Sequence, residues 1–195
     1  MDDEAVALAT LLATDLDGHF STLVQRYQEA LYRFALRLSN RPHDAEDIVQ
    51  EALLRGYVAL SHYPAAHIRA LHLRPWLYKV ALNVFRNSRR RVLSTCSLES
   101  DEANVALDMP DDEMAQPEIW LDWLERRQEL EQALELLAEH HREILICIYF
   151  EQLSYQEAAT LLDITLGTVR SRVHRGLKAL QNILSDEGKK HYETA

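Results

Sequence analysis

The chain has 195 residues and a formal net charge of −10, from 31 acidic and 21 basic residues. Five glycines and five prolines fall well below the average share of about 12% for these turn formers, which argues against a many-turned β-sandwich or barrel. An apolar content of 47% excludes wholesale disorder, and no apolar run approaches the length of a bilayer-spanning helix.

The predicted elements, in chain order, are helices. Residues 19–62 predict two helices separated by a turn at residues 40–43, and residues 63–73, which include Pro64, predict a loop. Residues 75–91 predict a third long helix, with Pro75 suited to its first turn. Residues 96–118 are rich in serine and acids and predict a linker. Helical periodicity resumes over 119–150, and residues 154–184 predict a helix, a short turn and a helix.

These elements predict an all-α fold of two small helical domains, residues 1–95 and 119–195, joined by a flexible acidic linker at 96–118. Two cysteines cannot form a disulfide scaffold and indicate a reducing compartment. The acidic residues near the N-terminus have the wrong sign for a signal peptide. We therefore expect a cytoplasmic protein without membrane insertion.

The charges are segregated along the chain. Residues 61–95 and 166–184 contain arginine and lysine but no acid, whereas residues 1–24 and 96–124 contain acids but neither lysine nor arginine. Each basic block can neutralise phosphates while the whole chain stays acidic. The distribution therefore predicts two nucleic-acid-binding surfaces that the net charge alone would hide.

On a helical wheel, residues 44–60 have a core face and an opposite face of mixed character. The opposite face gathers Asp47, Gln50, Glu51, Leu54 and Val58. Two aliphatic side chains among carboxylates are typical of a docking patch for a partner that carries arginine or lysine. Scattered surface apolar side chains are an equally good interpretation of these residues alone.

The helix predicted over 75–91 carries a basic stripe opposite its apolar face. The stripe and its borders consist of Lys79, Asn83, Arg86 and Arg90, with Trp76 and Asn87 flanking them and Tyr78 and Phe85 on the other edge. Cations, amides and aromatic rings together are typical of single-strand binding. The alternative is a cationic solvent face, but such faces usually mix the two signs of charge.

The C-terminal segment predicts a helix-turn-helix. Ser154 and Glu157 form a capping box that begins the first helix, and Thr165 can cap the second. The second helix buries Val169, Val173, Leu177 and Leu180 and carries cations on its other side. In a helix-turn-helix this helix enters the major groove, where arginine reads guanine edges or holds phosphates. A plain αα-hairpin is the alternative.

Three motifs in this order resemble the extracytoplasmic-function group of bacterial RNA polymerase sigma factors. They lie at residues 44–52, 74–83 and 153–172, and the resemblance covers about residues 18–184. It implies a sigma factor that binds core RNA polymerase through clamp and flap, recognises promoter DNA and starts transcription. It implies contact of residues 125–150 with the flap, and an anti-sigma factor as a further partner.

The resemblance also implies roles for individual residues. Asn83 matches the position that captures a flipped −10 base. The clamp-binding positions are Asp47, Gln50, Glu51 and Leu54. The −10 DNA contacts are Trp76, Lys79, Asn83, Arg86, Asn87 and Arg90. The −35 DNA contacts are Arg170, Ser171, Arg172, His174, Arg175 and Lys178, and the helix-turn-helix pattern itself adds Thr168.

The residues leave two rival functions open. A stand-alone helix-turn-helix regulator explains residues 150–184 but leaves the two N-terminal faces unused. A metal sensor, redox sensor or enzyme would use the nine histidines and two cysteines, but His141 and Cys147 are poorly spaced for ligands and no HExxH or CxxC exists. Cys147 lies in an aliphatic run and is expected in the core. We therefore expect no catalytic residues, metal or cofactor.

Overall fold

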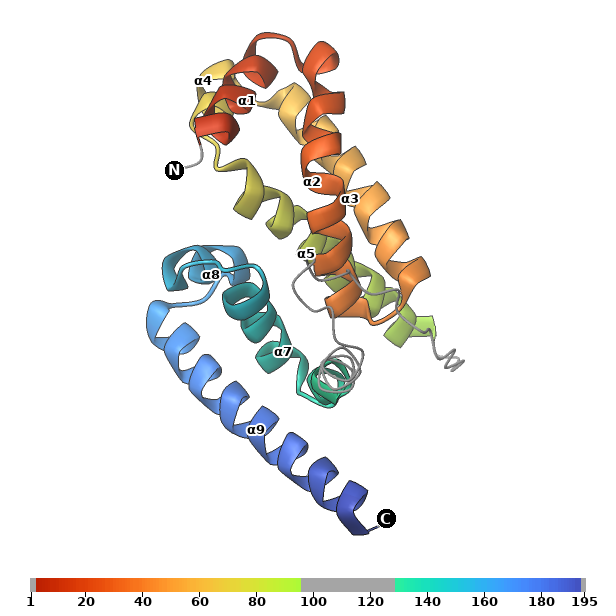
Figure 1. The fold of residues 1–195 in the computed structure, drawn as a ribbon. Coiled ribbons are helices and arrows are strands. Elements are labelled where there is room, and N and C mark those ends of the chain that lie inside the picture. The colour runs from red at the N-terminus through yellow and green to blue at the C-terminus, as the bar shows by residue number, and fades with distance from the viewer. Residues whose placement is uncertain (1–2, 96–128, 194–195) are drawn as a thin grey trace, which may run out of the picture. The chain divides into compact units, whose positions relative to one another are not determined.

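The computed structural model describes residues 3–95 and 129–193, and its regular elements there are helices without a strand (Figure 1). These residues fall into two compact units, 3–95 and 129–193. The first unit contains α1 (Asp3–Thr14), α2 (Leu16–Ser39), α3 (Pro42–His62), α4 (Ala65–Arg69) and α5 (Leu73–Thr95). The predicted all-α fold is confirmed. The predicted linker at 96–118 and the segment 119–128 lie outside the described residues.

Local signals set the ends of α2 and α3. The Asp15 carboxylate accepts a hydrogen bond of 3.0 Å from the Gly18 amide at the start of α2. Asn40 adopts a left-handed conformation, with φ of 56°, and its amide closes α2 on the Leu36 carbonyl. Pro42 then stands in the first turn of α3. A turn between the two helices is confirmed, but it spans residues 40–41, since residues 42 and 43 already belong to α3.

The core of the first unit lies between α2, α3 and α5. Side chains of α2 at helical spacing are buried: Leu23, Tyr27, Leu31, Phe34 and Leu38. Ala45 and Ala52 of α3 are also buried, and such small residues let helices approach closely. The rings of Phe34 and Tyr78 pack with centroids 4.7 Å apart, which joins α2 to α5.

Two helices of this unit were not predicted. α1 precedes the first predicted helix, and α4 lies within the predicted loop 63–73, so that prediction was wrong. α1 packs against α2 and α4, burying Leu8 and Leu12, while Ile68 of α4 is buried as well. A helix of five residues is unstable alone, so α4 depends on its contact with α1. No local sequence pattern predicts that contact.

The second unit is a helix-turn-helix with supporting helices. Residues 129–135 are helical, followed by α7 (Glu139–Leu145), the π-helix η1 (Ile146–Phe150), α8 (Tyr155–Leu162) and α9 (Leu166–Glu193). The capping box is confirmed, since Ser154 Oγ accepts from the Glu157 amide and the Glu157 carboxylate accepts from the Ser154 amide. Thr165 Oγ1 accepts from the Thr168 amide at 3.2 Å and caps α9, also as predicted.

The buried face of α9 differs in part from the prediction. Val169 and Val173 are buried, but Leu177 is 39% exposed. A Cβ on Gly176 would lie 3.3 Å from Leu145 of α7, so the contact stripe runs from Val173 to Gly176 and turns Leu177 outward. Cys147 is buried, as predicted for a core residue.

Candidate nucleic-acid and partner interfaces

The outer face of α3 carries the predicted docking patch. Leu54 and Val58 are 60% and 48% exposed, and their spacing of four residues places them on one face. Asp47 and Gln50 are exposed beside them. Glu51 is half-buried, and its carboxylate accepts a 2.6 Å hydrogen bond from Arg55 Nε. This arrangement leaves an aliphatic surface bordered by acids, suited to a basic partner.

The basic stripe of α5 lies on the side away from the core. Asn83 and Arg90 are exposed, and Lys79, Arg86 and Asn87 are half-buried. The buried side of the same helix carries Leu73, Leu77, Ala81, Leu82 and Phe85. Because the core fixes one side of α5, the cations and amides on the other side hold a fixed spacing along the helix.

The bordering aromatic residues do not offer the stacking faces that the sequence indicated. Tyr78 and Phe85 are both buried. Arg74 Nε donates to Tyr78 Oη at 3.3 Å, and the Arg89 guanidinium lies 5.8 Å from the Phe85 ring centroid. On a wheel both rings sit at the edge of the apolar side, and the packing of α2 on α5 draws them into the core. That part of the prediction was wrong.

Trp76 is half-buried where α5 passes α3. A Cβ added to Gly56 of α3 would lie 3.5 Å from Trp76 Cη2, so the indole packs over the space that this glycine leaves. The Tyr63 ring lies 6.3 Å from the Trp76 ring in an edge-to-face arrangement. Trp76 therefore joins the stripe to the end of α3 that leads into α4.

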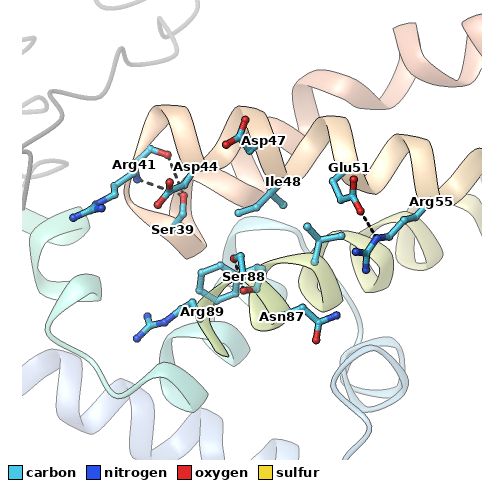
Figure 2. A pocket seen from close by; sticks show the side chains of 12 residues that line it. Ser39, Arg41, Asp44, Asp47, Ile48, Glu51, Arg55, Asn87, Ser88 and Arg89 are labelled. Carbon is cyan, nitrogen blue, oxygen red and sulfur yellow. Dashed lines mark hydrogen bonds and ion pairs between the residues drawn. The ribbon is translucent and has the colours of Figure 1, made fainter. Parts of the chain in front are cut away.

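A groove of about 580 Å³ lies between α3 and α5, and its lining includes two acids of the docking patch and Asn87, which flanks the basic stripe. Figure 2 shows Asp47 and Glu51 of α3 on one side and Asn87 and Arg89 of α5 on the other. The sequence predicted both surfaces but treated them separately, and it missed Arg89 as a lining residue. Only the crossing of α3 and α5 brings the two sets together.

The exposed side of α9 carries the predicted reading residues. Arg170, Ser171, His174, Arg175 and Lys178 are exposed, and Thr168 and Arg172 are half-buried. Ser171 Oγ donates to the Thr168 carbonyl at 3.0 Å, and Thr168 Oγ1 lies 2.9 Å from Thr165 Oγ1, so both hydroxyls already have partners in or next to the first turns of α9. The charged side chains are thus the principal outward groups of this helix.

Comparison with known families accounts for both units. The Sigma-70 region 2 family matches residues 23–93, and the Sigma-70 region 4 family matches residues 127–180. The ECF RNA polymerase sigma factor SigW of Bacillus subtilis is 30% identical over 171 residues, covering 86% of this chain and 89% of that protein. SigL of Mycobacterium tuberculosis is 32% identical over 178 residues, covering 85% of this chain and 89% of that protein.

The chain belongs to the sigma-70 family, in its ECF group. Another relative, SigE of Mycolicibacterium smegmatis, is 30% identical over 175 residues; the match covers 89% of this chain but 64% of that protein. The region 2 match covers the part of the chain that carries the two N-terminal surfaces, which a stand-alone helix-turn-helix regulator would leave unused.

Solved structures agree with this assignment. The sigma factor RpoE of Bartonella quintana, crystallised with the anti-sigma factor NepR, has a TM-score of 0.64 and 26% identity, covering 85% of this chain and 96% of that one. CnrH, in complex with the cytosolic domain of CnrY, has a TM-score of 0.65 at 21% identity and supports the fold, covering 93% of this chain and 97% of that one. This chain is thus a sigma factor that acts in transcription initiation.

His141 of this sigma factor lies against α9. A Cβ on Gly176 of α9 would be 3.5 Å from His141 Cβ, and the His140 ring lies 4.1 Å from the His141 ring. Burial lowers the pKa of His141, and the charges of His140, Arg172 and Arg175 lower it further. The folded state therefore favours the neutral imidazole.

We expect this sigma factor's C-terminal unit to lose stability as the pH falls through the ordinary histidine pKa of 6.5. The unfolded chain then binds a proton more readily than the folded chain, so acid favours unfolding. Amide hydrogen exchange of α7 and α9 in the full chain, between about pH 8 and pH 5, measures this loss. His141→Gln should reduce it, while His174→Gln, on the exposed side of α9, should leave it unchanged; equal pH dependence in all three proteins would contradict the assignment.

Within residues 3–95 and 129–193, no group of three or more histidine, cysteine or acidic side chains is arranged to hold a metal ion. Over the same ranges, no helix combines the length and apolar character needed to cross a membrane.

Proposed function

We propose that this sigma factor divides its work among three helical faces. The patch on α3 binds the polymerase clamp through Asp47, Gln50, Glu51 and Leu54. The stripe on α5 captures the −10 strand, and α9 reads the −35 element in the major groove. The observation that supports this assignment is the groove between α3 and α5, because Asp47 and Glu51 line one side of it and Asn87 lines the other.

Each of these roles belongs to one part of the chain. Residues 1–95 form the polymerase-binding and −10 domain, 96–118 the acidic linker, and 119–195 the −35 domain. Within the last of these, residues 125–150 meet the polymerase flap. The described part of that segment exposes Leu136 and Tyr149, which are available to an apolar partner.

Capture of the −10 strand requires no covalent step by this chain. Extruding a base from the duplex costs a few kcal/mol, and stacking of a base on an aromatic side chain stabilises the complex by about 1–3 kcal/mol. Asn83 stands exposed in the middle of the stripe, where its amide can bond the edge of an extruded base. Trp76, Lys79, Arg86, Asn87 and Arg90 hold the strand on either side. The chain accordingly acts by binding and not as an enzyme.

Binding of the −35 element relies on α9. Arg170 and Arg175 reach guanine edges or phosphates, and Lys178 holds the backbone. Thr168, Ser171, Arg172 and His174 complete the surface. The similar sigma factor RpoE of Bartonella quintana was co-crystallised with the anti-sigma factor NepR, so we also propose that an anti-sigma factor binds this chain in the cytoplasm.

Transcription with purified components tests the proposal. Core RNA polymerase plus this chain should start RNA synthesis at discrete sites on duplex fragments of a genomic library, whereas core alone should not. RNA ends mapped from the products then give the −10 and −35 sequences. Absence of any specific initiation, together with protection of a palindrome by the chain alone, would replace the proposal with a stand-alone regulator.

Replacing Leu54 with arginine should weaken binding to core polymerase by roughly tenfold or more, the size of a central interface contact. The change removes an exposed aliphatic contact and adds a cation where the neighbouring acids indicate a basic partner. Titration of core against a fluorescently labelled chain measures the affinity.

Leu11→Arg is the matched control for this change, since Leu11 is a 44% exposed leucine on α1 of the same unit. It should bind core as the unchanged chain does. If both arginine variants bind core with unaltered affinity, the clamp-binding face lies elsewhere.

A further inference from the structure

Two adjacent histidines near the start of α7 lie beside α9. α7 packs along α9 (Figure 1), and a Cβ on Gly176 of α9 would be 3.5 Å from His141 Cβ. His140 is exposed and His141 is half-buried, and the centroids of their rings are 4.1 Å apart. The contact at Gly176 therefore holds the pair at a fixed place beside α9, with His140 as its outer member.

Two arginines of α9 flank the same point. Arg172 lies one turn before Gly176 and Arg175 directly precedes it, so both side chains leave the helix close to His141. Burial lowers the pKa of His141, and the charges of His140, Arg172 and Arg175 lower it further. Neither arginine pairs with a carboxylate among the residues that the structure describes. These four basic side chains, His140, His141, Arg172 and Arg175, form a basic cluster at the contact of α7 with α9.

The neighbouring acids act mainly on other groups. Burial raises the pKa of Glu135, which Arg142 lowers and Glu131 raises, so these three charges act on one another. Glu139 begins α7, and its charge is not among those that shift the pKa of His141. The charges that act on His141 are therefore basic ones from α7 and α9.

An anion would remove the repulsion within the basic cluster, because like charges held together on a surface disfavour one another. Beside a helix that binds DNA, the available anion is a backbone phosphate. An α-helix with its side chains is about 10–12 Å across and the major groove is about 12 Å wide, so groups at the side of the helix meet the phosphates that line the groove. The basic cluster lies at that side of α9 and includes the exposed Arg175.

We propose that His140 and His141, with Arg172 beside them, contact a backbone phosphate at the edge of the −35 element, and that this contact takes up a proton. This inference rests on the proposed function of α9. A phosphate favours the charged form of imidazole and so raises the histidine pKa in the complex. Acid should therefore strengthen DNA binding, although it destabilises the unbound unit. Because the two rings lie close together, we expect the pair to take up about one proton and not two.

The test uses the holoenzyme and a duplex that carries the −35 element but a substituted −10 element, so that strand capture does not contribute. Affinity is measured between about pH 6 and pH 8 over a range of salt concentrations, where histidine titrates. At the acid end, the His140→Gln, His141→Gln variant should bind roughly three- to tenfold more weakly than the unchanged chain, and its salt slope should be lower by about 1, the value for one phosphate contact. At the alkaline end the two chains should differ little.

His140→Arg replaces the titrating group with a permanent cation. It should strengthen binding roughly three- to tenfold at about pH 8 and reduce the pH dependence. His72→Gln, at an exposed histidine of the first unit, is the matched control and should keep the pH and salt dependence of the unchanged chain. Core polymerase contributes the same background to every measurement, because only this chain is varied.

The exposed position of His140 keeps the inference testable even if the double variant does not fold, since His140→Gln and His140→Arg alter only the outer ring. Equal pH and salt dependence in the unchanged chain and the glutamine variants would overturn the inference. So would His140→Arg binding no more tightly than the unchanged chain at about pH 8. In these outcomes the unchanged holoenzyme still protects the −35 element. Failure of the unchanged holoenzyme to protect any −35 element would instead overturn the proposed function of α9.

Discussion

Replacing Asn83 with alanine should reduce open promoter complexes by roughly tenfold to 100-fold, because one base contact of about 1–3 kcal/mol no longer offsets extrusion of a −10 base. Asn83 is exposed at the centre of the stripe, and the side of α5 behind it is buried, so the substitution removes a contact group without disturbing the core. Closed-complex binding through α9 should change little. Permanganate reactivity of −10 thymines, measured beside total promoter occupancy, separates the two steps.

Gln28→Ala is the matched control for Asn83→Ala, since Gln28 is an exposed amide on α2 of the same unit. It should open promoters as the unchanged chain does. A premelted template offers a second check, because strands that are already separated remove the cost of extrusion and should restore part of the activity. Normal permanganate reactivity with Asn83→Ala would show that another residue captures the base.

Replacing Arg175 with alanine should lower affinity for the −35 element by about 1–3 kcal/mol, or roughly tenfold for each 1.4 kcal/mol. Arg175 is exposed on α9, and the buried face of that helix passes through Val169 and Val173. The variant should therefore fold. If Arg175 reads a guanine edge, preference at one position of the element should relax as affinity falls.

Lys178→Ala provides the comparison on the same helix. A lysine that holds phosphate should weaken binding to every sequence alike and lower the salt slope by about 1. Footprinting and competition with substituted −35 elements distinguish the two patterns. An unchanged footprint with Arg175→Ala would remove this residue from the reading surface, and uniform weakening would make it a phosphate contact.

Local chemistry explains why so much could be predicted from the sequence. Asn40 and Pro42 mark the turn between α2 and α3, and the Ser154–Glu157 capping box marks the start of α8. Such signals act within a few residues and do not depend on the rest of the fold. The outward faces of α3 and α5 follow from the helical period, which places their apolar side chains on the opposite side.

The same reasoning failed where packing between distant elements decides the outcome. Tyr78 and Phe85 lie at the edge of the apolar side of α5, and contact with α2 places Tyr78 in the core beside Phe34. Leu177 is turned outward because Gly176, without a side chain, admits Leu145 of α7 at the contact. A wheel gives directions around one helix but does not show where its neighbour crosses.

The amino-acid sequence by itself determined the all-helical composition, the main helix boundaries, the segregation of charge and the motifs of the sigma family. These depend on spacing and residue type along the chain. Only the tertiary structure decided the position of α4, the contact between the Tyr63 and Trp76 rings and the groove between α3 and α5. Each of these requires contacts between residues far apart in the chain, whose stability comes from packing and not from local propensity.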